Sequence, residues 1–116
     1  MEDLAKLVEE FRDNVAAQTA ALSTGAHGNK YARRYIRAFE KPRARGDEGR
    51  EALVPLMAEG NSPDVRSIAA GFLLRYRHDE ARRVLTEIAR GKGLIPFEAG
   101  EALKRWDEGV WQLDPG

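Results

Sequence analysis

Three features of the 116-residue sequence predict an all-α fold. Apolar residues recur three and four positions apart in successive stretches, which is the spacing of one face of a helix. Alternation of period two is absent and β-branched residues are few, so no stretch is typical of a strand. Glycine, proline and asparagine separate the periodic stretches, as they do at helix ends. We therefore expect about six helices.

The composition suits a domain that folds without covalent support. With 42% hydrophobic residues the chain can bury roughly two-thirds of its unfolded surface, and it has no cysteine for a disulfide or a thiolate metal site. The first residues are acidic where a secretory signal is basic, and no apolar run is long enough to cross a bilayer. The 19 basic and 19 acidic residues cancel. We expect a cytoplasmic protein without a membrane partner.

The N-terminal part of the chain predicts two amphipathic helices. The first runs from about Glu2 to Leu22 and ends before Gly25 and Gly28. Asn29 can cap the second. The residues expected to be buried are Leu4, Leu7, Val8, Phe11 and Val15 in the first helix and Tyr31, Tyr35, Ile36 and Phe39 in the second.

Capping residues and two prolines define the next two helices. Asp47 can cap the third helix, and Pro55 lies inside it. A proline in a helix interior removes a hydrogen bond and costs about 3 kcal/mol, so this helix is expected to be bent or short. Ser62 can cap the fourth helix, with Pro63 first in the helix and Asp64 at its positive end. The residues expected to be buried are Leu53, Val54, Leu56 and Met57, then Val65, Ile68, Ala69, Phe72, Leu73 and Tyr76.

Two further helices complete the expected fold. Asp79 can cap the fifth helix, which Gly91 and Gly93 close. The sixth runs from about Pro96 to Trp106. The residues expected to point inward are Val84, Leu85, Ile88 and Ala89 in the fifth helix and Phe97, Ala99, Ala102, Leu103 and Trp106 in the sixth.

The apolar pattern of the third and fourth helices recurs in the fifth and sixth. At a step of thirty residues, Ile95, Ala99, Ala102, Leu103 and Trp106 repeat Val65, Ala69, Phe72, Leu73 and Tyr76. At a step of thirty-one, Val84, Leu85, Ile88, Ala89 and Gly91 repeat Leu53, Val54, Met57, Ala58 and Gly60. A helix pair is thus repeated, and the copies are expected to stack because one pair cannot bury its apolar face alone.

The repeated segments resemble a known family. Leu53-Val54-Pro55-Leu56, Pro63-Asp64-Val65-Arg66 and Ala69-Ala70 through Leu73 resemble a HEAT repeat, whose first helix often holds a proline and whose second opens with Asp-Val-Arg. In the second copy Ile95-Pro96 replaces Val65-Arg66, as in a terminal cap. The whole chain, including 29–35 and 106–111, is similar to a small bacterial family of uncharacterised HEAT-like proteins. The resemblance implies a HEAT-like α-α superhelix, and related small helical-repeat families include immunity proteins that neutralise toxins.

The repeat also sets the expected domain organisation. We expect a single domain over residues 1–116, in which an N-terminal helix pair over 1–46 precedes two helix-pair repeats over 47–106. A tail over 107–116 is expected to pack back on the last pair through Val110-Trp111-Gln112-Leu113, because an exposed indole forfeits burial.

Basic residues gather between Lys30 and Arg45, where seven of them accompany one acid. Arg33, Arg37 and Lys41 form a stripe at four-residue steps, and Arg34 lies beside it. Three interpretations of this stripe are open. Its side chains are solvated or paired with the acidic first helix, they bind a protein, or they bind nucleic-acid phosphates. Arg66 likewise has two interpretations, a contact to the adjacent loop or a neighbouring acid, or an exposed binding residue.

Residues able to do chemistry do not form a recognised catalytic or metal-binding set. His27 and His78 have no second ligand at helical spacing, and we expect both to be solvated at loop edges. Glu98 and Glu101 lie one turn apart, which is routine on a solvated helix face. We therefore expect no enzyme activity, metal or cofactor. The predicted function is a protein-interaction module, monomeric or homodimeric, such as an immunity or adaptor protein with a toxin as its partner; the alternative is a nucleic-acid-associated protein.

Overall fold

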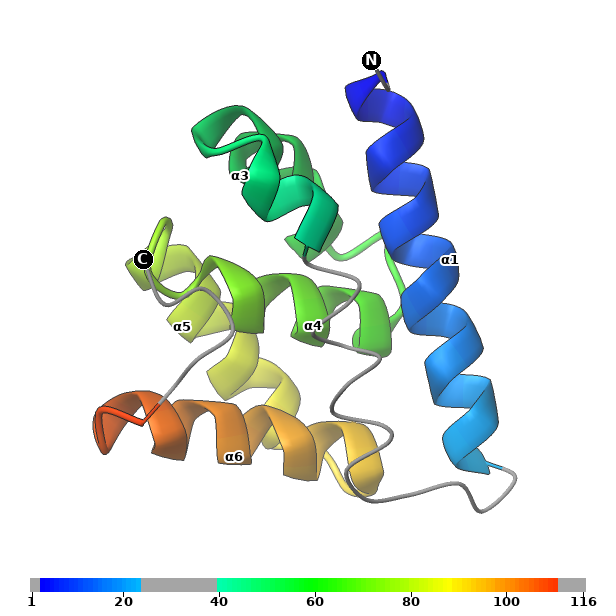
Figure 1. Ribbon diagram of the computed structural model, residues 1–116. Helices are drawn as coiled ribbons and strands as arrows, with labels where there is room; N and C mark the ends of the chain where they lie inside the picture. Colours follow the sequence, from blue (N-terminus) through cyan, green and yellow to red (C-terminus); the bar gives the residue numbers. More distant parts are fainter. Residues whose placement is uncertain (1–2, 24–39, 111–116) are drawn as a thin grey trace. The chain divides into compact units, whose positions relative to one another are not determined.

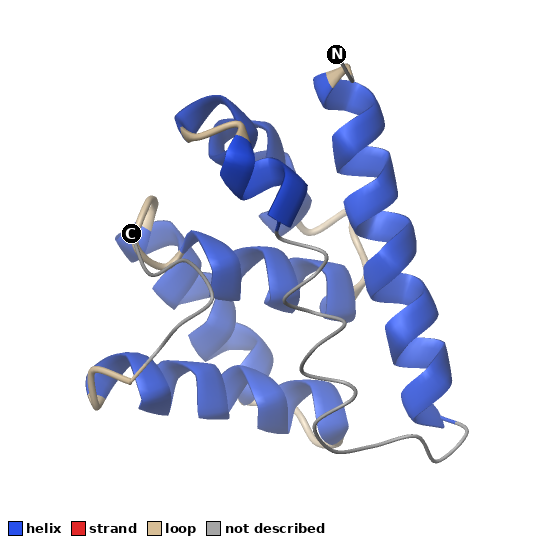
Figure 2. Cartoon of the chain, viewed as in Figure 1, coloured by secondary structure: helices blue, strands red, loops and turns tan. Residues whose placement is uncertain are grey.

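The computed structural model describes residues 3–23 and 40–110, and in this part of the chain every regular element is a helix (Figure 2). The all-α prediction is confirmed. No helix within these residues is both long and apolar enough to span a membrane. The elements in chain order are α1 (Leu4–Ser23), α3 (Asp47–Leu53), the 3-10 helix η1 (Val54–Met57), α4 (Pro63–Leu73), α5 (His78–Ala89) and α6 (Leu94–Asp107).

The described residues divide into two compact units, one ending at Leu53 and one beginning at Val54. In the first unit α1 packs against α3, and residues 40–44 are also helical. Among the residues of α1 whose burial is described, Leu7, Phe11 and Val15 are buried, as predicted, and Leu4 and Val8 are half-buried. Asp3 accepts a hydrogen bond from the Ala5 backbone at 3.3 Å and so supports the start of the helix.

A tight turn leads from the helical residues 40–44 into α3. Gly46 turns the chain with a φ of +64°, a conformation that favours glycine. Gly49 then lies against the backbone of the preceding segment, since a Cβ built on it would be 2.1 Å from the carbonyl oxygen of Pro42. Only a residue without a side chain allows this close approach.

Pro55 ends the α-helical part of the third helix, as predicted. The α-helix stops at Leu53, and the chain continues as the 3-10 helix Val54–Met57. A proline at position 55 cannot donate to the carbonyl of residue 51, and its ring would clash with that carbonyl in an α-helix. Leu56 and Met57 are nevertheless buried, so the tighter helix still delivers apolar side chains to the second unit.

The fourth helix lies at the centre of the second unit, where η1, α5 and α6 all contact it (Figure 1). Ser62 occupies the predicted N-cap position and Pro63 begins α4, but the Ser62 hydroxyl donates to Asp64 and not to the backbone. The α-helix ends at Leu73, and Ile68 and Tyr76 are only half-buried. The buried residues of α4 are Val65, Ser67, Ala69, Ala70, Gly71, Phe72 and Leu73.

The fifth helix begins two residues earlier than a cap at Asp79 predicts. Arg77 occupies the N-cap position and His78 the first helical position, so the prediction that Asp79 caps α5 is wrong. The backbone of Arg77 already donates to Leu73 at 2.7 Å, which keeps the connecting turn close to helical geometry. Asp79 instead lies in the first turn, where its charge favours the helix N-terminus. Ala81, Val84, Leu85 and Ile88 are buried, and Ala89 is half-buried.

The sixth helix buries much less than the sequence pattern predicted. It begins at Leu94, after Gly93 with a φ of +115°. Ala99 is its one buried residue among those described, while Phe97 is 61% exposed, so the prediction that Phe97 points inward is wrong. Two positions separate these residues, which places them on nearly opposite sides of a helix. Ala102, Leu103 and Trp106 are half-buried.

The two copies of the repeat differ in how completely they are covered. Both α5 and α6 begin thirty-one residues after their counterparts α3 and α4. Ser67 and Leu74 of the first copy are buried, whereas their counterparts Phe97 and Lys104 are exposed. Among the described elements, η1, α5 and α6 pack against α4, whereas α4 and α5 pack against α6, so the first copy is the more completely covered of the two in this part of the chain.

Gly100 offers a direct way to stabilise α6. A Cβ at this position would contact the Cβ of Ala89 at 3.9 Å, an ordinary packing distance. We expect Gly100→Ala to raise the free energy of unfolding by about 0.5–1 kcal/mol, because glycine is unfavourable inside a helix. Urea unfolding followed by circular dichroism measures the change. Gly93→Ala is expected to destabilise, since its φ is left-handed; a loss of stability in Gly100→Ala would contradict the packing described.

Candidate interaction surface

The predicted basic stripe is only partly within the described residues. Arg33, Arg34 and Arg37 lie outside them, and Lys41 lies inside. The Lys41 ammonium group is 3.1 Å from a carboxylate oxygen of Glu10 on α1. This contact is the pairing with the acidic first helix that one of the three interpretations predicts. The binding roles of the stripe stay predictions.

The Lys41–Glu10 pair is expected to be weak. The side chains are 59% and 36% exposed, so water and salt screen their attraction. A double-mutant cycle with Lys41→Ala and Glu10→Ala should give a coupling of about 0.2–1 kcal/mol that shrinks as salt is added. Thermal or urea unfolding of the four proteins measures it. Coupling that does not respond to salt would contradict an exposed pair.

Arg66 points back along its own helix pair. Its Nε donates a hydrogen bond to the backbone carbonyl of Met57 at 3.0 Å, and the contact is partly buried. The arginine side chain thereby donates to a carbonyl that has no partner within the 3-10 helix, and this hydrogen bond joins η1 to α4. This is the loop contact that the structural interpretation of Arg66 predicts, and the binding role of Arg66 stays a prediction.

Exposed apolar side chains mark the beginning of α6. Leu94 is 47% exposed and Phe97, one turn later, is 61% exposed. We call these two residues the α6 apolar patch. Two large apolar side chains exposed one turn apart form a contiguous patch, which is the kind of surface that a partner can cover. The patch was not predicted from the sequence. Phe97 and Ala99 lie on nearly opposite sides of a helix, so both cannot face the same core, and this spacing indicates that one of them is exposed.

Polar and aromatic contacts join the start of α5 to the end of α6. Arg82 donates to both carboxylate oxygens of Asp107, at 3.0 and 3.4 Å. This hydrogen bond, together with the charge of Asp107, raises the pKa of Arg82. His78 stacks on Trp106 with ring centroids 5.3 Å apart, and its Nδ1 is buried without a hydrogen-bond partner. The prediction that His78 is solvated is therefore wrong, and His27 lies outside the described residues.

A second surface feature runs along α5. A shallow, open hollow of about 430 Å³ follows one side of the helix. Among the described residues, its lining consists of polar and charged residues of α5 and its C-cap residue: Asp79, Arg82, Arg83, Thr86, Glu87 and Arg90. Both arginines and carboxylates line it, so the hollow suits a charged partner surface better than a small apolar ligand.

The described residues place no three potential metal-ligating His, Asp or Glu side chains together. At the other end of α6, Val110 is 55% exposed, and Trp111 to Leu113 lie outside the described residues. Comparison of the whole chain with protein-family models, curated proteins and solved structures found no match.

Proposed function

We propose that this chain is a HEAT-like helical-repeat protein that binds another protein and catalyses no reaction. The observation that supports it is the α6 apolar patch, in which Phe97 is 61% exposed next to the half-exposed Leu94. Aromatic residues that become buried at the centre of a protein–protein interface often contribute most of the binding free energy. Exposing large apolar side chains to water is unfavourable, so a contiguous exposed apolar patch is typical of an interface.

The arrangement of helices supports the same proposal. Stacked helix pairs create an extended surface without needing an enclosed cavity. The hollow on α5 is open, and the described residues that line it come from this one helix and its C-cap residue, whereas catalytic pockets usually collect groups from several elements. An immunity or adaptor protein acting in the cytoplasm, with a toxin as one candidate partner, fits these features.

Affinity capture from the native cell tests the proposal. The bait is the full chain, compared with a Leu94→Ala/Phe97→Ala variant and with Lys104→Ala/Arg105→Ala as a matched control on the exposed part of the same helix. A partner protein captured by the wild type should bind the patch variant at least about tenfold more weakly and the control unchanged. Circular dichroism establishes that all three proteins are folded. Equal capture by the patch variant would refute the proposed surface.

The nucleic-acid alternative is decided by a separate measurement. Binding of duplex and single-stranded DNA is followed at low and high salt, since phosphate contacts weaken steeply with salt. We expect no binding at low salt, in keeping with the pairing of Lys41 with Glu10. Salt-sensitive binding that disappears in Arg33→Glu/Arg37→Glu/Lys41→Glu would replace the protein-binding proposal with the alternative.

A further inference from the structure

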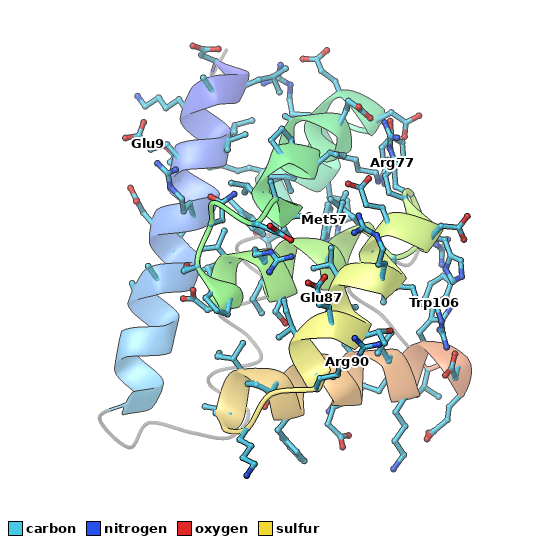
Figure 3. All side chains as sticks on the ribbon, turned by 180° about the vertical axis from the view of Figure 1, so that it is seen from behind. Glu9, Met57, Arg77, Glu87, Arg90 and Trp106 are labelled. Carbon is cyan, nitrogen blue, oxygen red and sulfur yellow. The ribbon has the colours of Figure 1, made fainter. Side chains whose placement is uncertain are left out.

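One face of α5 presents charged residues that remain unpaired. Asp79, Arg83, Glu87 and Arg90 are exposed and recur three and four positions apart, and Figure 3 labels Glu87 on the helix and Arg90 directly after it. In the described part of the chain none of the four forms an ion pair, although Arg83 and Glu87 are one helical turn apart. We call these four residues the α5 charged face. It offers both signs of charge to another molecule.

The order of these charges makes the face complementary to itself. When two copies of a helix pack antiparallel, residues equally far before and after the midpoint lie opposite each other. With Leu85 as the midpoint, Arg83 of one copy lies opposite Glu87 of the other. Asp79 lies opposite Arg90 to within one residue, or about 1.5 Å along the axis. Two-fold symmetry forms each pair twice and opposes no like charges directly.

We infer that two copies of this chain associate through the α5 charged face, helix against helix and antiparallel. The hollow along α5 provides room for the side chains of the second copy. Thr86, which lines the hollow and follows the midpoint residue Leu85, is short, and its hydroxyl donates to the carbonyl of Arg82 at 2.7 Å. The contact therefore has charged residues at its two ends and a small side chain at its centre.

The expected association is weak and depends on salt. A single helix face is smaller than the roughly 800 Å² per partner that a stable interface buries. Exposed ion pairs also contribute little individually and are screened by salt. The contact is independent of the α6 apolar patch, so its failure and the failure of the proposed function are distinguishable.

Sedimentation equilibrium of the full chain tests the inference at up to about 1 mM protein. At about 20 mM salt we expect dimers, whose dissociation constant rises at least tenfold at about 500 mM salt. Arg83→Glu and Glu87→Arg should each weaken the dimer at least tenfold, because each opposes like charges. A mixture of the two variants should dimerise like the wild type, because every opposed pair then has unlike charges.

Matched controls separate this contact from a general effect of charge. Lys104→Glu, on α6, and Glu108→Arg, at its C-cap, change the net charge by the same amounts at exposed positions and should leave dimerisation unchanged. Circular dichroism of each variant confirms that it is folded. A wild type that stays monomeric at low salt, an undiminished dimer in Arg83→Glu, or a mixture that fails to recover would each overturn the inference.

Discussion

Replacing Phe72 by alanine is expected to lower the free energy of unfolding by about 3–5 kcal/mol. Phe72 is fully buried on α4, the helix that η1, α5 and α6 all contact. Truncation removes the transfer free energy of the ring and leaves a cavity that these neighbours cannot all move to fill. Urea unfolding followed by circular dichroism measures the loss.

The same substitution at Phe97 is the matched control for Phe72→Ala. Phe97 is 61% exposed, so its replacement should change the unfolding free energy by no more than about 0.5 kcal/mol. The pair of variants holds the chemistry constant and changes only the burial. Similar losses at both positions would show that the second unit is not centred on α4.

Replacing Gly49 by alanine is expected to lower the free energy of unfolding by about 1–3 kcal/mol. The added Cβ would lie 2.1 Å from the carbonyl oxygen of Pro42, and backbone atoms cannot move aside as a flexible side chain can. The turn into α3 must therefore open. Thermal and urea unfolding measure the loss. Gly60→Ala is the control, because a Cβ there meets nothing within 4 Å, and a neutral result at both glycines would contradict the close approach.

Local signals predicted where several helices begin and end. Asp47 is the first residue of α3, one position after the cap position predicted for it. Pro63 begins α4 after Ser62, and Pro55 converts the end of the third helix to 3-10 geometry. Each of these effects depends on a residue's own backbone preferences and on its immediate neighbours. Sequence reasoning succeeds at such positions because no distant contact is needed to decide them.

The errors arise where distant contacts or the end of a stack decide the outcome. Asp79 has the right chemistry for a cap, but the turn after Leu73 already holds Arg77 in position to begin the helix. The apolar pattern of α6 copies that of α4, yet no further element in the described chain covers the side that bears Phe97. Periodicity identifies a helix and cannot report how many of its faces are covered.

The candidate surfaces were predictable only in part. The pairing of Lys41 with Glu10 joins residues thirty-one positions apart and depends on how α1 and the helical residues 40–44 pack. The contact from Arg66 to Met57 follows from stacking within one helix pair and was among the predicted alternatives. The α5 charged face is visible in the sequence as charges at helical spacing, but its lack of internal ion pairs is visible only in the structure.

Amide hydrogen exchange of the full chain tests most directly the claim that, within the described residues, α4 is buried more completely than α6. Amides of α4 should exchange only through global unfolding, whereas those of α6 should exchange at least about tenfold faster through local opening. Equal protection in the two helices, or greater protection in α6, would contradict the account.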